Sequence, residues 1–369
     1  MAAGAWLVLA SLAARANESS SGYPPAHLTT ERAAEDALPA GLYARFETAR
    51  GRIVARLHAE SAPLAVANFV GLAEGTVAFE HRPVGQPFYD GLRFHRVVDG
   101  FVVQGGDPLG SGEGGPGYTI ADEFTPRLKH DAAGVLALAN DGPNTNGSQF
   151  YFTLSAANRL NYKHTVFGRV VQGLDVLALI RAGDVLERVR ILRVGDEAGA
   201  FRVDDEVLGR LRAAVAPIPP RHAALPRLFA NEARLDLPAF YPAWLNDKLH
   251  HYAEVRGISL FVRIVHHFEG ATDELAISGA LAGLHEGLAQ RDPRSATLVY
   301  TTEDRRWHLW LGDGLFGPLG ASPDRIAAVK AQLLAGAVAQ TQAGFPRRAI
   351  DAAVTDLIEA LDRGEVRGP

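Results

Sequence analysis

The stretch FHRVVDGFVVQGGD, residues 94–107, places two polar side chains in a run that otherwise reads as a strand facing a core. Arg96 and Gln104 must find partners there or lose solvation energy. Val102 and Gln104 are two residues apart, so a strand brings both to one face, as in the wall of a pocket. A half-exposed strand with Arg96 in water is an equally good explanation, and this stretch by itself leaves both interpretations open.

Two further patterns resemble sites and are interpreted as loops. Gly110, Gly112 and Gly115 fit the spacing G-x-G-x-x-G, but Pro116 follows where a dinucleotide site needs a helix. We therefore expect a flexible glycine-rich loop. The run Asn144–Gly147 is typical of a turn rather than of an amide-rich catalytic site.

The histidine pairs do not predict a metal site. His250-His251 and His266-His267, with Glu269 nearby, offer ligand types that zinc accepts. Adjacent residues of a strand point to opposite faces, so neither pair converges on one ion by itself. Packing or surface roles are the better interpretation.

The bulk composition is that of a folded soluble protein with more than one core. The chain has 369 residues, of which 47% are hydrophobic and 21% charged, and this length favours two domains. A net charge of −5 argues against nucleic acid as a main partner, because phosphate binding needs a basic surface. The absence of cysteine excludes disulfides, thiolate nucleophiles and cysteine–zinc sites.

The N-terminal segment predicts export. An apolar stretch over residues 5–14 ends at Ala14-Arg15-Ala16, which has the pattern of a signal-peptidase site, so a signal peptide covering residues 1–16 is expected. The stretch is shorter than the roughly 20 apolar residues of a membrane span, and none is expected in the mature chain. No Lys or Arg precedes it, and a frayed alanine-rich start is the alternative. The expected location is the bacterial periplasm, or the cytoplasm under that alternative.

Short strands and glycine-rich turns dominate the first half of the chain. Residues 42–48 and 52–57 predict a hairpin, and residues 188–194 predict a final strand. Ser61 is expected to cap a helix with Pro63 in its first turn and Gly75 at its end, and a second helix fits residues 174–181. Many short strands with two helices favour a closed antiparallel β-barrel. An insert at residues 77–86 is interpreted as a surface loop.

The pattern changes after the prolines at 217–220, which cannot continue the helix expected over residues 204–216. An amphipathic helix fits residues 244–255, and a buried strand fits residues 258–265. A β-pair is expected over residues 296–301 and 306–311, with closing helices near 323–339 and 349–361. This half predicts a separate α/β domain.

Three blocks in the first half carry a family resemblance. FHRVVDGFVVQGGD is followed by LANDGPNTNGSQFYF at 138–152 and KHTVFGRV at 163–170. In this order and spacing they resemble the cyclophilins over residues 40–196. The resemblance implies an eight-stranded antiparallel β-barrel, closed and capped by two helices, and peptidyl-prolyl cis-trans isomerase activity without cofactor, metal or covalent intermediate. Its implied partners are proline-containing peptides or unfolded protein clients.

The resemblance also answers the question raised by Arg96. Amide resonance sets a rotation barrier of about 18–20 kcal/mol, and in the twisted state the proline nitrogen regains a lone pair. A cationic donor to that nitrogen stabilises the twisted state over both planar states, which is what accelerates a step. Arginine suits this role because it stays protonated and offers a rigid fork of donors. By resemblance that catalytic residue is Arg96.

The remaining roles are carried over residue by residue. The resemblance implies an apolar proline pocket formed by Phe101, Val102, Tyr151 and Leu160. It implies backbone or polar contacts to an extended substrate from Gln104, Ala139, Asn140 and Gln149, with His164 at the pocket rim and Gly112 in the loop at the groove edge. Phe94 and His95 match the motif but are expected to pack and orient.

Three positions depart from the family pattern. Members that bind cyclosporin tightly carry tryptophan where this chain has Arg159, so weak cyclosporin binding is expected. Tyr151 replaces a frequent phenylalanine, and its hydroxyl needs a partner or a route to water. Val102 replaces a frequent methionine and leaves more room in the pocket. Activity is expected, with an altered preference for the residue before proline.

The domain plan that follows is a signal peptide at 1–16, a flexible lead-in at 17–39, the cyclophilin-like domain at 40–196, a linker at 197–225 and an α/β domain at 226–369. The last resembles the TPM domain in pattern, without an acidic metal cluster, and is interpreted as a binding or localisation module. The leading hypothesis is an isomerase for exported protein clients. The alternatives are a proline-peptide binding scaffold whose C-terminal domain selects partners, and a bifunctional isomerase and hydrolase.

Overall fold

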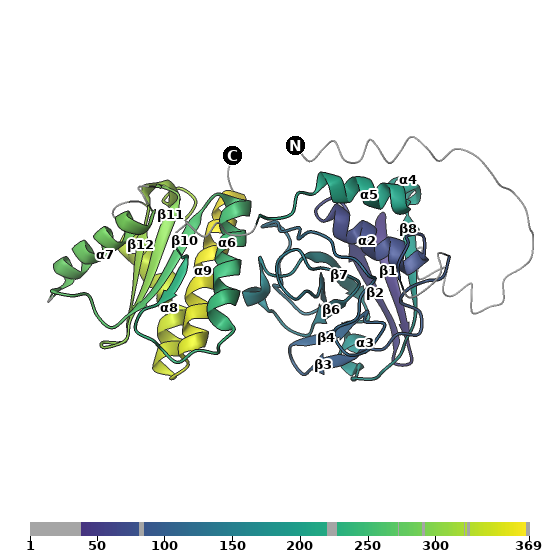
Figure 1. Ribbon diagram of the computed structural model, residues 1–369, viewed down its shortest axis with the longest axis horizontal. Coiled ribbons are helices and arrows are strands. Elements are labelled where there is room, and N and C mark those ends of the chain that lie inside the picture. The colour runs from purple at the N-terminus through teal and green to yellow at the C-terminus, as the bar shows by residue number, and fades with distance from the viewer. Residues whose placement is uncertain are drawn as a thin grey trace, which may run out of the picture. The chain divides into compact units, whose positions relative to one another are not determined.

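The computed structural model describes residues 38–80, 85–219, 227–271, 273–289, 292–320, 322 and 325–366. The chain divides into two compact units, each with its own sheet, and each unit is described by itself (Figure 1). The first unit holds residues up to 218 apart from Asn161–Lys163, which are grouped with the second unit. The predicted signal peptide and most of the lead-in lie outside the described residues.

The first unit is built on one curled antiparallel sheet of eight strands, in the order β3-β4-β6-β5-β7-β2-β1-β8, which confirms the predicted strand number and direction. The strands are β1 Gly41–Thr48, β2 Gly51–Leu57, β3 Arg96–Val98, β4 Val102–Gly105, β5 Val135–Leu138, β6 Phe150–Thr153, β7 Val166–Gln172 and β8 Leu186–Val194.

The two edge strands, β3 and β8, are joined by the segments that precede them in the chain. Arg93 and Val185 form an isolated antiparallel bridge. Backbone hydrogen bonds from Phe94 N–H to Asp184 O (2.9 Å) and from Leu186 N–H to Leu92 O (2.8 Å) continue this connection. The sheet therefore closes through residues 91–94 and 183–186 and not through a ladder between the strands themselves.

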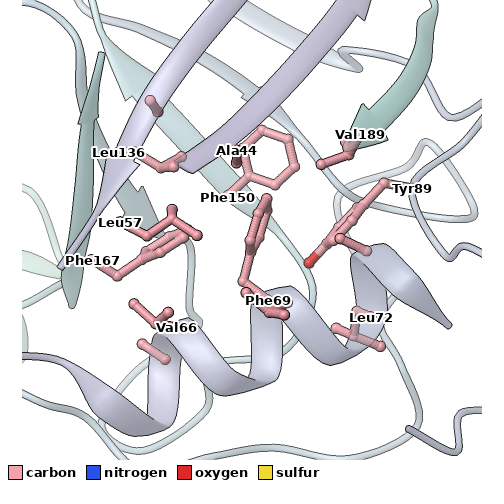
Figure 2. Packing of buried hydrophobic residues seen from close by; sticks show 14 of the residues in the cluster. Ala44, Leu57, Val66, Phe69, Leu72, Tyr89, Leu136, Phe150, Phe167 and Val189 are labelled. Atoms are coloured by element: carbon pink, nitrogen blue, oxygen red, sulfur yellow. The ribbon is translucent and has the colours of Figure 1, made fainter. Parts of the chain in front are cut away.

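The core of this unit is rich in aromatic rings. Phe69, on α2 (Pro63–Glu74), points from the helix into the sheet (Figure 2). Its ring centroid lies 5.0 Å from that of Tyr89, 5.2 Å from Phe167 and 5.8 Å from Phe150. All four side chains are buried. A cluster of this kind removes a large apolar area from water and fixes α2 on the sheet.

The start of α2 corrects one sequence prediction. The N-cap is Ala62 and not Ser61, so no side chain at the cap position accepts a hydrogen bond from the first turn. The free N–H groups of the first turn are instead satisfied from a distance: Leu64 N–H and Ala65 N–H donate to the two carboxylate oxygens of Glu123, at 3.1 and 2.7 Å. The helix ends at Gly75 in the left-handed conformation, as expected.

This half-buried carboxyl predicts a pH-dependent stability. Burial raises the pKa of Glu123 from 4.5 to about 7, against the opposing effect of the Ala65 and Leu64 donors. Because the folded-state pKa is the higher one, the stabilisation is present below the unfolded pKa and is lost as pH rises through about 7. Between pH 5 and pH 8 we expect a loss of about 2 kcal/mol.

The measurement is a urea series read by hydrogen exchange in peptides from β4 to β7, which isolates the first unit. Glu123→Gln, which cannot titrate, should show a shallower pH dependence than the wild type. Parallel pH profiles for the two proteins would show that Glu123 does not carry the effect.

The described part of this unit also contains η1 Asn158–Leu160, α3 Leu174–Leu179, α4 Asp196–Ala200 and α5 Asp205–Ala214. The insert at 77–86 is only partly a surface loop, because Val77 is fully buried and Phe79 packs against the core. Phe79 and Phe88 meet edge to face at 5.0 Å. Residues 81–84 of the insert lie outside the described residues.

The second unit is an α/β domain, as predicted. Its four-stranded sheet has the order β12-β11-β10-β9, with β9 and β11 parallel to β10 and β12 antiparallel to β11. The elements are β9 Phe229–Asn231, α6 Tyr241–Arg256, β10 Ser259–Val265, α7 Glu274–Ala289, β11 Ser295–Thr301, β12 Arg306–Leu311, η2 Asp313–Leu315, α8 Ile326–Gln342 and α9 Pro346–Val366.

The second unit bears on two of the sequence interpretations. His250 and His251 lie on α6, not on a strand. Within the residues that the structure describes, no group of three or more acidic or histidine side chains is arranged to hold a metal ion. Among the described residues of both units, no helix has the length and apolarity that a membrane crossing requires.

Candidate active site

Three of the predicted site residues lie along one row of the sheet. Arg96 of β3 is opposite Gln104 of β4, and Gln104 is in turn opposite Tyr151 of β6. The row continues to Ala137 of β5. Residues in register on neighbouring antiparallel strands point to the same face. The sheet therefore brings the arginine, the glutamine and the tyrosine to one side.

That face carries a second apolar cluster, separate from the main core. Strand alternation divides the residues: Val103 and Phe152 belong to the main core, whereas Val102 and Tyr151 belong to this outer cluster. Its members are Val102, Val135, Ala137, Tyr151, Ala157, Leu160 and Val166, with Phe101, Leu128 and Ala139 packed against them. The four residues predicted to form the proline pocket are thus brought together.

A chain of amide hydrogen bonds links Arg96 to the glycine-rich loop. Arg96 Nη1 donates to Gln104 Oε1 at 3.3 Å, and Gln104 Nε2 donates to Gln149 Oε1 at 2.9 Å. Gln149 Nε2 then donates to the carbonyls of Gly112 (2.7 Å) and Gly114 (2.8 Å). The two glutamines orient the guanidinium from one side. Arg96 is exposed, so its remaining donors are accessible to solvent.

The glycine-rich loop is held from inside by Asp107, a residue that the sequence analysis did not single out. Its carboxylate is buried and accepts from Leu109 N–H (2.7 Å) and Gly112 N–H. Burial alone would raise the pKa of Asp107, but the backbone donors outweigh it and the net pKa is lowered. The segment is a loop without a following helix, as expected, but where a flexible loop was expected the ionised Asp107 carboxylate ties its backbone at Leu109 and Gly112.

The hydroxyl of Tyr151 finds the partner that its burial demands. It lies 2.8 Å from His130 Nε2, and the two rings stack with centroids 5.9 Å apart. Burial raises the pKa of Tyr151 well above its ordinary value, so the phenol stays neutral. His164 meets the same ring edge to face, with the ring centroids 5.6 Å apart. His130 was missed because nothing local marks it.

The other predicted contacts lie at the end of β5. Ala139 N–H donates to Gln149 O at 2.9 Å. Asn140 Nδ2 lies 3.4 Å from Asp122 Oδ1 and 3.2 Å from Asn146 Oδ1. Asp122 is buried and accepts from Asn144 N–H (2.7 Å) and Asn146 Nδ2 (2.7 Å). Asp122 therefore holds the turn predicted at Asn144–Gly147, and with it the position of Asn140.

Arg159 lies over the Phe101 ring, with Cζ 4.4 Å from the ring centroid. The Arg159 guanidinium covers the face of this ring with a hydrated positive charge, whereas a tryptophan at this position would offer a flat apolar surface. We expect cyclosporin to bind weakly, and Arg159→Trp to tighten its dissociation constant by about tenfold or more. Isothermal titration of both proteins is the measurement. Sub-micromolar binding by the wild type would contradict this account of Arg159.

Fold and site together define a class: a curled β-barrel whose outer face sets an apolar pocket beside an exposed, oriented arginine. The family model for the cyclophilin type peptidyl-prolyl cis-trans isomerases matches residues 43–196. The chain is 53% identical to peptidyl-prolyl cis-trans isomerase A of Mycobacterium tuberculosis over 133 residues, which cover 35% of this chain and 72% of that protein. The chain belongs to the cyclophilin-type peptidyl-prolyl cis-trans isomerase family.

Two further comparisons found similar proteins. Peptidyl-prolyl cis-trans isomerase B of Streptomyces anulatus is 51% identical over 133 residues, covering 35% of this chain and 76% of its own. The crystal structure of a cyclophilin type isomerase from Cryptosporidium parvum is 30% identical and covers 42% of this chain and 98% of its own, with a TM-score of 0.37.

Proposed function

We propose that the first unit accelerates rotation about X-Pro bonds of extended clients, with Arg96 as the catalytic donor. The proline ring occupies the outer apolar cluster, between Phe101, Val102, Tyr151 and Leu160. Arg96 donates to the proline nitrogen as it loses conjugation, and Gln104 holds both the guanidinium and the substrate backbone. The row Arg96–Gln104–Tyr151 beside the apolar cluster is the observation that carries the proposal.

This mechanism needs no covalent step. The enzyme binds the twisted amide more tightly than either planar isomer, and that difference lowers the barrier. Each ~1.4 kcal/mol of differential binding gives about tenfold in rate. A charge-assisted hydrogen bond that exists only in the twisted state supplies this kind of difference.

The test is a refolding assay on a protein whose slow phase is limited by an X-Pro bond. We expect catalytic amounts of the wild type to shorten that phase in proportion to enzyme concentration. A proline-peptide binding scaffold, the second candidate, would slow refolding or leave it unchanged while still binding the client. The open groove next to a fixed loop is compatible with either, so this assay separates them.

The proposed clients are exported proteins, and the support is the signal-like N-terminal segment, which lies outside the described residues. Mass spectrometry of the protein from its native cell checks this: a mature chain beginning at Asn17 is expected in the periplasmic fraction. A chain beginning at Met1 or Ala2 in the cytoplasm would point to cytoplasmic clients.

For the second unit we propose a binding or localisation role, tested by comparing the location of the full chain with that of residues 1–218.

A further inference from the structure

Residues 161–163 belong to the second compact unit, although the residues on both sides of them in the chain belong to the first. Asn161, Tyr162 and Lys163 are only 4%, 4% and 5% exposed. Polar side chains with so little exposure need hydrogen-bond partners. Partners for Tyr162 and Lys163 come from α6 and α9, two helices that lie side by side in the second unit (Figure 1).

The phenol of Tyr162 binds a buried carboxylate. Tyr162 Oη lies 3.0 and 2.9 Å from the two carboxylate oxygens of Asp362 on α9 and donates its proton to that carboxylate. Asp362 is almost fully buried and also accepts from Arg256 Nε of α6 at 3.1 Å, which compensates its charge. The rings of Tyr162 and Tyr252 meet edge to face, with their centroids 4.9 Å apart. Burial, reinforced by Asp362, raises the pKa of Tyr162, so the phenol keeps its proton and remains a donor.

The backbone of Tyr162 has a conformation that is unfavourable for tyrosine. Its φ is +61°, in the left-handed region, where a bulky residue other than glycine is strained. Such strain persists only where the surroundings impose it. The Tyr162 carbonyl accepts from His251 Nδ1 of α6 at 2.9 Å, and Lys163 Nζ pairs with Asp247 Oδ2 of the same helix at 3.3 Å. Burial lowers the pKa of His251 to about 4, so this imidazole is neutral and carries its proton on Nδ1.

Tyr162 is the apex of a turn whose two ends are predicted pocket residues. Leu160 belongs to the outer apolar cluster, and the His164 ring packs against the ring of Tyr151 in the same cluster. His164 N–H donates to Leu160 O at 3.2 Å and closes the turn. Only one residue separates Tyr162 from either end, so the place of Tyr162 limits where Leu160 and His164 can lie.

We propose that Tyr162 is a positioning residue of the isomerase: the second unit holds it through Asp362 and His251, and the turn then sets Leu160 and His164 for the proline ring. The inference rests on the proposed function, because it concerns the same pocket. It makes the second unit a working part of the enzyme. The pocket binds the proline ring in the planar and twisted states alike, so loosening the turn should raise KM and leave kcat unchanged.

The test is steady-state isomerisation of an Ala-Pro peptide by the full-length variant Tyr162→Phe, which keeps the ring and removes the donor to Asp362. We expect KM to rise about fivefold or more, with kcat within about twofold of the wild type. Asp362→Asn should also raise KM, and adding Tyr162→Phe to it should cause little further rise, because both changes act on one hydrogen bond. A merely structural defect would reduce the amount of active enzyme, which lowers kcat at an unchanged KM.

The matched control is Tyr241→Phe. Tyr241 Oη of α6 donates to Asp351 Oδ1 of α9 at 2.7 Å, so it also forms a buried tyrosine–carboxylate bond between these helices, but outside the turn at 160–164. Its KM and kcat should both stay within about twofold of the wild type. If Tyr162→Phe does not fold, Tyr162→Gly replaces it, because glycine adopts this φ without strain and lacks the phenol; the same rise in KM is expected.

An unchanged KM in the folded Tyr162 variant, or a rise that Tyr241→Phe reproduces, overturns the inference and leaves the proposed function standing. If the wild type does not isomerise the peptide, the proposed function is wrong. The inference is then decided by titration of the same peptide. A dissociation constant about fivefold higher in the Tyr162 variant than in the wild type supports it, and an equal one overturns it.

Discussion

Replacing Arg96 by alanine is expected to lower kcat/KM for peptide isomerisation by about 10²–10³-fold, the usual loss when one preorganised donor to a developing charge is removed. The ground-state affinity for the peptide should change little, because the apolar cluster that holds the proline ring does not include this side chain. Folding should be unaffected, since Arg96 is exposed and its side chain makes one hydrogen bond to the described residues, with Gln104. Coupled peptide kinetics and a binding titration measure both quantities.

Two variants sharpen this result. Arg96→Lys keeps the charge but loses the rigid fork of donors, so we expect an intermediate rate. Arg188→Ala removes an exposed arginine from β8 and should keep the wild-type rate, which controls for net charge. A rate for Arg96→Ala within threefold of the wild type would mean that the twisted amide is stabilised by some other group.

Replacing Phe69 by alanine should destabilise the first unit by about 3–5 kcal/mol, since it leaves a cavity in a close-packed aromatic cluster. The side chain is fully buried and touches rings from other parts of the unit, including Phe46 at 5.8 Å and Tyr89 at 5.0 Å. This is a large fraction of the stability of an ordinary domain. The effect reaches the site only through folding, because Phe69 lies in the main core and not in the outer cluster.

Urea unfolding read by hydrogen exchange in β1–β8 measures the loss. Val171→Ala, at a side chain that is 48% exposed, provides the control and should cost less than about 1 kcal/mol. A change of similar size for both variants would contradict the assignment of the core to the aromatic cluster. If Phe69→Ala does not fold, Phe69→Leu, with an expected cost of about 1–2 kcal/mol, replaces it in the comparison.

The sequence could predict what depends on local pattern. Strand alternation placed Val102 and Gln104 on one face, and the hairpin predicted from residues 42–48 and 52–57 forms between β1 and β2. Gly75 ends α2 in the left-handed conformation that glycine favours. Such features depend on a few neighbouring residues, so the local sequence is enough to predict them.

The parts that escaped prediction depend on partners distant in the chain. Glu123 completes the first turn of α2 from 59 residues away, which Ser61 was expected to do. His130 satisfies Tyr151, and Asp122 fixes the turn that carries Asn144. A buried hydroxyl or N–H group demands a partner, but the demand does not say which residue supplies it. Only the fold brings those carboxylates and rings to their places.

The most direct test of the central claim is exchange spectroscopy by NMR on an Ala-Pro peptide with catalytic amounts of the wild-type protein. Uncatalysed X-Pro bonds exchange over tens to hundreds of seconds. We predict exchange between the cis and trans resonances within a second, at a rate proportional to enzyme concentration. A peptide whose signals shift on binding while its exchange stays at the uncatalysed rate would contradict the claim, because the groove would then hold proline without turning it.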